Sequence, residues 1–400
     1  MVEKRYIRIV LFFAALLLLA VAGVNYIVNP LNAYNAPVIR GVNNIHPAAG
    51  TYTRLYKTEA VKRQKPDVIV IGTSRADTGF NPRTEYFPDS KPYNFALPAA
   101  GIIEQSRQLE FAQAVAPLKQ AIITLDFFTF NAKKLENKQF DPERLSAEAL
   151  KQPRSFFDTY GTVVALDTFI AAVKHLSRLK HPERYDDSDD NGHKISSGVE
   201  YAIRKDGAHK RFATPPNEDE INASDFAFNY SRTPGDDTFQ HFEAMLEFTR
   251  KNSIDVILII PPVHQTYLDT LEKTGRGPLV EKWKARLTEI VNANAVRYSQ
   301  RVYPLWDFAY YNEITTEPVP APDDKTTRPK WFYDSNHFTT ALGDVVLEKV
   351  LGINDDYPDF GRRHDRRRAL IAGRRLAGRG RRHHRRRRRD QHPGRLSGQR

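Results

Sequence analysis

The sequence predicts an α/β fold: a three-layer sandwich with a mostly parallel sheet, preceded by a transmembrane helix and carrying a large, mostly helical insertion. Short β-branched runs alternate with longer segments of helical apolar spacing, which is typical of a parallel sheet covered by helices on both faces. The chain has 400 residues, 40% of them apolar, which is enough for a large hydrophobic core. A separate apolar run lies near the N-terminus, outside this alternation.

Residues 9–28 form that apolar run, and Asn25 is its strongly polar member. Twenty residues at 1.5 Å each match a hydrocarbon core of about 30 Å. Three basic residues precede the run, so we expect residues 1–8 in the cytoplasm and the following domain on the periplasmic side of a bacterial inner membrane, anchored by a single pass. A signal peptide cleaved near Ala22 is the alternative, and the continuation of the run to Val28 favours the uncleaved anchor.

The rest of the chain divides into a stalk and one domain. Residues 29–64 are rich in turn residues and are interpreted as the stalk, and the α/β domain is predicted over residues 65–360. Its expected strands cover 68–71, 93–96, 120–126, 255–260 and 302–306, and its expected helices cover 102–115, 239–252, 279–298 and 338–351. Residues 132–235 break the alternation with two helical segments and a polar, strand-poor stretch, so we interpret them as an insertion over the sheet.

The net charge of +12 is concentrated at the C-terminus. Residues 361–400 hold 17 of the 60 Lys and Arg residues and two of the 48 Asp and Glu residues, so residues 1–360 carry 43 basic against 46 acidic side chains. This body is nearly neutral, and we expect no nucleic-acid partner. Residues 361–400 lack apolar periodicity and are expected to be an Arg-rich disordered tail. The alternative is a segment foreign to the fold, after a change of reading frame near Gly361.

Several kinds of metal or cofactor site are excluded by the sequence. The chain contains no cysteine, which removes disulfides, thiolate metal sites and cysteine nucleophiles. It has no glycine-rich phosphate loop and no His-Glu-x-x-His zinc motif. Asp187–Gly192 imitates the start of a calcium loop, but Gly198 stands where that loop needs a bidentate glutamate. We therefore expect a solvated acidic loop there, no metal and no cofactor.

Ser74 is the first candidate for a chemical role. It follows the β-branched run Val68–Ile71 after Gly72 and Thr73. In an open α/β sheet, ligands bind outside the carboxyl ends of the strands, so Ser74 would lie where chemistry is usually done. The alternative is that Thr73 or Ser74 only caps the next helix.

Asp334 and His337 are the second candidate. They follow the last predicted strand and open the last helix, where a spacing of three lets both side chains face one cleft and lets the carboxylate orient the imidazole. The same spacing recurs at Asp190 and His193, inside the polar part of the insertion, where we interpret it as a loop. Asp307, after the strand over 302–306, is a rival partner for the imidazole.

These blocks together carry a resemblance. Gly72-Thr73-Ser74-Arg75 after the first strand, Gly101 after the second and Asp334-x-x-His337 near the end resemble the SGNH, or GDSL-like, hydrolase superfamily. The anchor and the insertion make the chain most similar to the branch with the alginate O-acetyltransferase-like proteins of the bacterial envelope. The resemblance covers residues 66–352, with its strong matches in the first and last blocks.

The resemblance implies a role for each of these residues. Ser74 would be the nucleophile, His337 the general base and then acid, and Asp334 the residue that orients His337. The backbone N–H groups of Ser74 and Gly101 would help to stabilise the oxyanion. A serine hydroxyl is a weak nucleophile until a base takes its proton, and preset oxyanion donors contribute on the order of 3 kcal/mol.

The third block departs from the family pattern. The family usually supplies an asparagine there as an oxyanion donor, whereas the matching strand here ends at Asp126, and an ionised carboxylate cannot donate a hydrogen bond. Either Asn131 or Asn94 substitutes, or Asp126 binds substrate hydroxyls, or the oxyanion hole is weaker.

Two further residues are candidates for substrate binding. Arg75 would pair with a substrate carboxylate or simply with Asp77. His264 follows a strand and two prolines, so it either lines the cleft or is satisfied by the Pro-rich turn.

The resulting expectation is an envelope-anchored Ser-His-Asp acyl enzyme. It would move or remove an ester-linked acyl group, chiefly acetyl, on an extracytoplasmic polysaccharide through an acyl-serine intermediate. Because acetyl-CoA is cytoplasmic, the transferase version implies a multi-pass membrane partner that exports the acyl group. The alternative from a different class is a non-catalytic envelope protein that binds polysaccharide or scaffolds an assembly.

Overall fold

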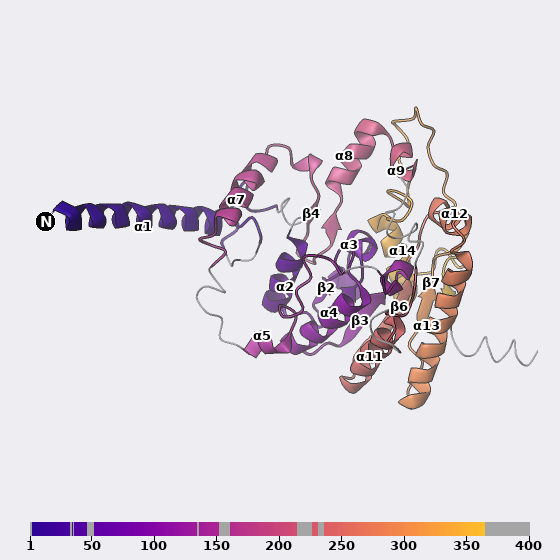
Figure 1. The fold of residues 1–400 in the computed structure, drawn as a ribbon. Helices are drawn as coiled ribbons and strands as arrows, with labels where there is room; N and C mark the ends of the chain where they lie inside the picture. The colour runs from indigo at the N-terminus through magenta and orange to yellow at the C-terminus, as the bar shows by residue number, and fades with distance from the viewer. Residues whose placement is uncertain are drawn as a thin grey trace, which may run out of the picture.

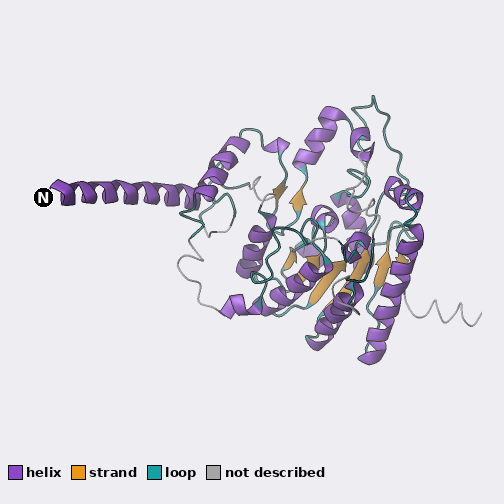
Figure 2. Ribbon diagram, viewed as in Figure 1, coloured by secondary structure: helices purple, strands orange, loops and turns teal. Residues whose placement is uncertain are grey.

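The computed structural model describes residues 2–32, 34, 36–45, 52–133, 136–151, 161–213, 226–230 and 236–364. Its centre is a six-stranded sheet with the strand order β2-β1-β3-β6-β7-β8 (Figures 1 and 2). Five of these strands are parallel, and β8 pairs antiparallel with β7. The strands are β1 (Val68–Ile71), β2 (Pro92–Asn94), β3 (Gln120–Thr124), β6 (Asp255–Ile260), β7 (Leu305–Asp307) and β8 (Arg362–Arg363). The predicted α/β fold with a mostly parallel sheet is thus confirmed.

Helices cover both faces of the sheet. Successive strand side chains point to opposite faces, and those of each face are buried in a separate cluster under these helices. Ile69 and Ile71 of β1 point to one cluster, and Val68 and Val70 point to the other. The first cluster is completed by α2 (Thr53–Gln64), α4 (Ile102–Val115), α11 (Thr238–Lys251), α12 (Gln265–Lys273) and α13 (Gly277–Arg297). The second is completed by α3 (Ser74–Gly79), α8 (Ser197–Asp206), α9 (His209–Ala213) and α14 (Thr340–Leu351). The described residues also form the short 3-10 helices η2 (Thr84–Tyr86), η3 (Phe127–Phe130) and η4 (Pro182–Arg184).

The order of the strands creates a crevice beside β1. From β1 the chain passes to β2 on one side and then returns to β3 on the other side of β1. The connections that leave the carboxyl ends of β1 and β3 therefore diverge to opposite faces, which is the point where open α/β sheets bind their ligands. Ser74 follows β1 and Asp126 follows β3, so both lie where the strand order reverses.

The apolar N-terminal run forms one long helix that projects from the domain (Figure 1). Helix α1 covers Val2–Val28 and therefore begins before the predicted start at residue 9. Within it, residues 3–28 are long and apolar enough to span a membrane or to be a signal sequence.

Part of the expected stalk belongs to the domain instead. Residues 53–64 form α2, whose Tyr56, Ala60 and Val61 are buried in the first cluster. Lys57 of the same helix is also buried, and its ammonium donates to Asp77 Oδ1 at 2.5 Å and to two backbone carbonyls. The abundance of turn residues on both sides of this segment concealed its apolar side. Of the expected stalk, residues 29–32, 34, 36–45 and 52 remain outside regular elements among the described residues.

The insertion adds no strand to the main sheet within its described parts. It contains α5 (Ala147–Lys151), α7 (Leu166–Arg178), α8, α9 and the small antiparallel pair β4 (Asp187–Ser188) and β5 (Lys194–Ile195). The second helical segment that the sequence predicts in the insertion, over residues 156–179, begins at Leu166, and residues 152–160 lie outside the described residues. Helices α8 and α9 fall in the stretch that we predicted to be polar and poor in strands, within a mostly helical insertion.

The acidic loop is packed against the domain rather than solvated on all sides. The carbonyl oxygen of Asn191 accepts from the backbone N–H of Asn94, at the end of β2, over 2.7 Å. Gly192 has a φ of 75°, and a Cβ there would lie 2.5 Å from the carbonyl oxygen of Asn94. Glycine is needed here both for the left-handed backbone and for the close approach.

The boundary of the C-terminal tail is also corrected. Residues 361–364, assigned to the tail because of their arginines, add β8 to the edge of the sheet. Arg362 lies over the ring of Tyr310 at 3.7 Å, and the backbone N–H of His364 donates to Leu305 at 2.8 Å. The arginines are tolerated because an edge strand leaves one side to solvent. The remaining tail, residues 365–400, lies outside the described residues.

We therefore expect two C-terminal truncations to differ. A chain that ends at His364 should unfold at the same denaturant concentration as the full chain. A chain that ends at Phe360 loses β8 and its contacts with Tyr310 and Asp307, and its free energy of unfolding should fall by about 1–3 kcal/mol. Urea unfolding followed by tryptophan fluorescence measures both, and equal stability of the two truncated chains would contradict the place of β8 in the fold.

Candidate active site

Ser74 is presented at the end of β1 by a capped turn. Thr73 is the N-cap of α3, and its side-chain oxygen accepts from the backbone N–H of Arg75 at 3.3 Å. The capping role thus falls to Thr73, and the hydroxyl of Ser74, the first residue of the helix, is turned to another partner. Gly72 is required just before, because a Cβ there would overlap the side chain of Thr124 on β3.

His337 lies in a hairpin that immediately precedes α14. Phe332 and Phe338 form an isolated antiparallel bridge, and Tyr333 N–H donates to the His337 carbonyl oxygen at 2.9 Å. The predicted opening of a helix at Asp334 is therefore a tight turn, and α14 itself begins at Thr340. This turn is held against α3 because the ring of Phe338 fills the space where a Cβ of Gly79 would be.

The structure brings the three residues of the first and last blocks into one hydrogen-bonded chain. Ser74 Oγ lies 2.9 Å from His337 Nε2. His337 Nδ1 lies 3.0 Å and 3.1 Å from the two carboxylate oxygens of Asp334. With its proton on Nδ1, the imidazole donates to Asp334 and keeps the lone pair of Nε2 for the proton of Ser74. The side chain of His337 is 29% exposed, so the group is reachable from solvent.

Asp334 is held in its ionised form. Burial alone would raise the pKa of its carboxyl group, but the electrostatic attraction and the hydrogen bond of His337 oppose this effect. The backbone N–H groups of Asn336 and His337, at 3.0 Å and 2.8 Å, also donate to the carboxylate. Together these partners keep the pKa of Asp334 well below its usual range.

This lowered pKa predicts how the stability depends on pH. A carboxyl group whose pKa is lower in the folded than in the unfolded chain stabilises the fold above the unfolded pKa, about 3.9, and loses that contribution as the pH falls further. At pH 7 we expect Asp334→Asn to reduce the free energy of unfolding by on the order of 2 kcal/mol, and at pH 3 by clearly less. Urea titrations at the two pH values measure the gap, and the exposed Asp323→Asn serves as control. A gap that stays constant would contradict the assignment.

Arg211 is a member of this site that the sequence did not reveal. It comes from α9 in the insertion, and its guanidinium donates to Asp334 Oδ2 at 3.1 Å. Its Nε donates to the Tyr333 carbonyl oxygen at 3.2 Å. The insertion thus supplies a second charged partner of the carboxylate besides His337. A single arginine in an irregular polar segment carries no motif, so no sequence signal marks this residue.

The two predicted oxyanion donors are the backbone N–H groups of Ser74 and Gly101, and they differ in the charge that surrounds them. Ser74 begins α3 and Gly101 is the N-cap of α4, and backbone N–H groups at such positions have no partner within the helix. A Cβ on Gly101 would, however, lie 2.7 Å from the Glu136 carboxylate. A negative side chain beside Gly101 disfavours a second negative charge there.

The structure engages the two suggested asparagines differently, and the role of Asn131 as an oxyanion donor stays a prediction because only its amide oxygen is bound. Asn131 Oδ1 accepts from the backbone N–H groups of Lys133 and Ala227, which orders the segment after η3. Asn94 donates both its amide protons to backbone carbonyls of Ala76 and Phe80, and it is fully buried. The side chain of Asn94 is therefore structural, and the suggested substitution by Asn94 is wrong.

Arg75 and Asp126 bind each other rather than lining an open cleft. Arg75 Nη1 donates to Asp126 Oδ1 at 2.6 Å, and Thr73 Oγ1 donates to Asp126 Oδ2 at 2.7 Å. Arg75 and Asp126 are only 3% and 1% exposed, and the guanidinium also lies over the rings of Phe128 and Tyr267. The predicted substrate-binding roles are corrected: this buried ion pair ties the turn that carries Ser74 to the end of β3.

The partners of the other charged candidates also differ from expectation. Asp77, the suggested partner of Arg75, pairs instead with Lys57 of α2. His193, of the second Asp-x-x-His, is buried between α3 and α14, where its Nε2 contacts the Thr78 carbonyl oxygen at 3.0 Å and Thr340 Oγ1 at 3.1 Å.

His264 is a structural residue beside the site. It is fully buried, its Nε2 donates to the Glu317 carbonyl oxygen at 2.7 Å, and its Nδ1 accepts from Thr266. Burial lowers its pKa and favours this neutral form. The predicted place in the cleft is wrong, and the alternative of a histidine satisfied by the Pro-rich turn holds only for Nδ1, because the partner of Nε2 is Glu317 in a distant segment. Its backbone N–H donates to the Ser335 carbonyl oxygen at 3.0 Å, so it supports the turn after Asp334.

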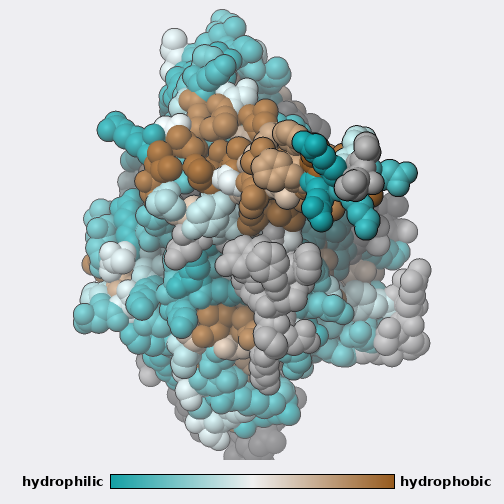
Figure 3. Space-filling model, turned by 90° about the vertical axis from the view of Figure 1, so that its left-hand side faces the viewer, coloured by the Kyte–Doolittle hydropathy of each residue, from teal (hydrophilic) through white to brown (hydrophobic). Residues whose placement is uncertain are grey.

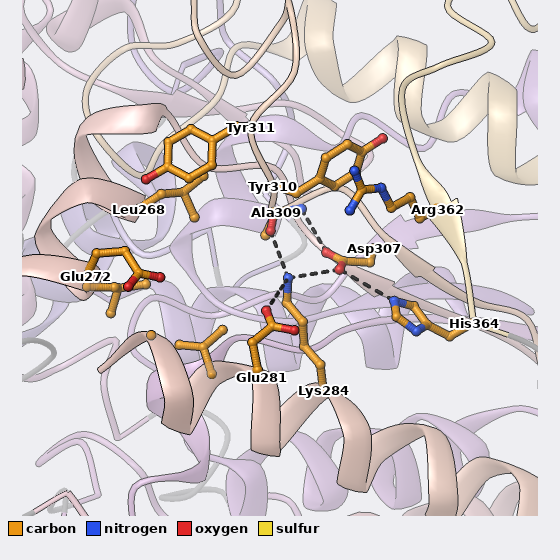
Figure 4. A pocket seen from close by; sticks show the side chains of 13 residues that line it. Leu268, Glu272, Glu281, Lys284, Asp307, Ala309, Tyr310, Tyr311, Arg362 and His364 are labelled. Carbon is orange, nitrogen blue, oxygen red and sulfur yellow. Dashed lines mark hydrogen bonds and ion pairs between the residues drawn. The ribbon is translucent and has the colours of Figure 1, made fainter. Parts of the chain in front are cut away.

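Asp307 belongs to a different place in the fold. It ends β7 and lines a cavity of about 190 Å³ between α12, α13 and β8, together with Arg362 and His364 (Figure 4). Its carboxylate pairs with Lys284 at 2.8 Å and lies 3.5 Å from His364. These contacts engage Asp307 outside the Ser74 group, so its suggestion as partner of His337 is wrong.

Comparisons with known proteins add no identification: no family model matches the chain, and no curated protein matches it. Among the residues that the structure describes, no cluster of three or more acidic or histidine side chains is arranged to hold a metal ion.

Proposed function

We propose that the protein is a membrane-anchored Ser-His-Asp acyl enzyme that acts on acyl esters of an extracytoplasmic polysaccharide. The observation that carries the proposal is the chain of hydrogen bonds from Ser74 through His337 to Asp334 at the carboxyl edge of a parallel sheet. The order of the blocks along the sequence, which resembles that of SGNH hydrolases, supports the same chemistry. The activity is O-acetyl transfer or acetyl ester hydrolysis.

The first half-reaction forms an acyl-serine. Ser74 Oγ attacks the carbonyl carbon of the ester while His337 Nε2 takes the hydroxyl proton. Asp334 keeps the other ring proton on Nδ1 and stabilises the imidazolium that forms. The N–H groups at the start of α3 and α4 would face the developing oxyanion. His337 then gives its proton to the leaving alcohol, and the acyl group stays on Ser74.

The second half-reaction decides between hydrolysis and transfer. His337 takes a proton from water or from a sugar hydroxyl, the resulting oxygen attacks the acyl carbon, and the proton returns to Ser74 Oγ. A transferase on the outer side of the membrane needs an acyl donor there. A multi-pass membrane partner that exports acyl groups would supply it, and α1 would keep the domain next to such a partner.

Two observations favour the second candidate, a non-catalytic polysaccharide-binding or scaffold protein. The position of the family asparagine is filled by Asp126, whose carboxylate is consumed by Arg75 and Thr73. Glu136 also lies beside Gly101. Both features weaken the stabilisation of an oxyanion, and neither affects the geometry of Ser74 and His337.

Mass spectrometry of the full chain in detergent tests the proposal. After a brief exposure to an activated aryl acetate, we expect one added acetyl group on the peptide that contains Ser74 and none in Ser74→Ala. Oligosaccharide acceptors are then added, and acetyl found on sugar identifies a transferase, whereas release only to water identifies an esterase. If wild type gives neither an adduct nor ester turnover, the acyl-enzyme proposal fails and the binding protein takes its place.

A further inference from the structure

Helix α7 has an exposed apolar stripe on the side opposite to its packed face. The packed face lies against α1 and the segment that follows it, and consists of Thr168, Ala171, Ala172 and His175, whose Nε2 contacts the Val42 carbonyl oxygen at 2.9 Å. The stripe is exposed to solvent and consists of Leu166 (67%), Ile170 (42%), Val173 (52%) and Leu176 (40%). Spacings of three and four align these four side chains along one side of the helix. A soluble domain gains nothing from such a surface, which requires an explanation.

The position of α7 is fixed by the end of α1. Asn25 is fully buried, and its Nδ2 donates to the backbone oxygens of Val163 at 2.7 Å and Ala165 at 3.2 Å. Tyr34 Oη, a few residues after α1, donates to Thr162 Oγ1 at 2.7 Å. Helix α7 therefore starts beside the last turn of α1 and leads away from it (Figure 1).

The length of α1 sets the depth of this junction in a membrane. Arg8 is the last charged residue before the apolar run, and twenty residues from Ile9 reach Val28, enough to cross about 30 Å of hydrocarbon. Asn25 stands three residues before this end, roughly 5 Å along the helix axis. Helix α7 starts at the level of Asn25, so its stripe is held at the boundary between hydrocarbon and headgroups, where interfacial helices bury their apolar face by about 5–10 Å.

The charges and the surroundings of α7 fit the same surface. Basic side chains flank the stripe and follow the helix; they are Lys174, Arg178, Lys180 and Arg184, against the acidic Asp167 and Glu183. Long basic side chains at such a boundary reach outward to lipid phosphates. The neighbouring loop adds exposed Val38 and Ile39, followed by Arg40. Figure 3 shows apolar surface spreading outward around the base of α1 on this face of the molecule.

We propose that α7 is an interfacial helix that lies in the surface of the bilayer, with its apolar stripe among the lipid tails and its basic side chains at anionic headgroups. The proposal rests on the membrane anchorage by α1 that is part of the proposed function. Two attached elements, α1 across the membrane and α7 along it, would fix the orientation of the domain as well as its distance from the lipid.

The absence of native cysteine allows a direct test with single-cysteine variants of the full chain. Val173→Cys reports on the stripe, Leu17→Cys reports on the exposed middle of α1, and Val296→Cys is the matched control, an equally exposed valine at the end of α13. Each is labelled with a nitrobenzoxadiazole dye and placed, one copy per disc, in nanodiscs of phosphatidylcholine and phosphatidylglycerol. Quenching is measured with nitroxide-labelled lipid and with aqueous iodide.

We expect the dyes at positions 17 and 173 to be blue-shifted and quenched by the nitroxide lipid, and the dye at 296 to be quenched by iodide alone. If position 17 is quenched by lipid but 173 behaves as 296 does, the anchor stands and the interfacial helix is refuted. A dye at 173 that neither quencher reaches would mean that protein covers the stripe, which also refutes it. If even position 17 stays in water, the anchor itself fails and the inference falls with it.

Discussion

Replacing Ser74 with alanine is expected to lower the rate of aryl acetate turnover by on the order of 10⁴-fold or more while the fold stays intact. The reason is that the proposed acyl group is carried by Ser74 Oγ, and the residual rate would come only from binding and from oxyanion donors. His337→Ala should lose a comparable factor, because the hydroxyl is then left without its base. The double variant should be no slower than either single variant, because the two residues act as one unit.

The control for this substitution is Ser90→Ala, the same chemical change just before β2. This position lies at the amino ends of the parallel strands, away from Ser74 at their carboxyl ends. Its turnover should equal that of wild type. Circular dichroism and urea unfolding of all variants separate a loss of chemistry from a loss of fold. Turnover in Ser74→Ala within tenfold of wild type would remove Ser74 from the role of nucleophile.

The second large effect concerns stability. Replacing Asp126 with alanine leaves the buried guanidinium of Arg75 without its carboxylate and removes the acceptor of Thr73, so the free energy of unfolding should fall by about 3–5 kcal/mol. Urea unfolding measures this loss. Because the same pair ties the Ser74 turn to β3, the turnover rate should fall as well.

A matched control is available on the surface of the same sheet. Asp255 pairs with Arg301 at 2.6 Å, but their side chains are 40% and 75% exposed, so Asp255→Ala should cost no more than about 1 kcal/mol. The double variant with Arg75→Met and Asp126→Leu should recover much of the lost stability, because no buried charge is then left alone. If Asp126→Ala costs as little as Asp255→Ala, the pair does not hold the site together.

Much of the candidate site was predictable because the ends of parallel strands lie at one edge of a sheet. Ser74 follows the first strand, and Asp334 and His337 follow the strand predicted over 302–306, so this rule together with the order of the blocks predicted them near one another, and the distances agree with it. The central strands β1, β3 and β6 were recognisable from their β-branched runs.

The sequence failed where a residue is defined by its partner. Arg75 and Asp126 are buried against each other in the fold. They are 51 positions apart, and no spacing in the sequence predicts such a long-range ion pair. Arg211 reaches Asp334 from an insertion without a motif. Helix α2 was hidden by its turn-rich flanks, and β8 by its arginines, which are compatible with an edge strand although they suggest a tail.

Ser74 and His337 are separated by 263 positions, and this separation has a consequence during synthesis of the protein. The first three strands of the sheet, with the serine, leave the ribosome long before the hairpin that carries the histidine. A serine hydroxyl without its base is a weak nucleophile, so the proposed enzyme would not react with esters while its chain is still being synthesised. In this proposal, reactivity would arise only when the hairpin before α14 docks on α3, and a prematurely terminated chain would stay unreactive.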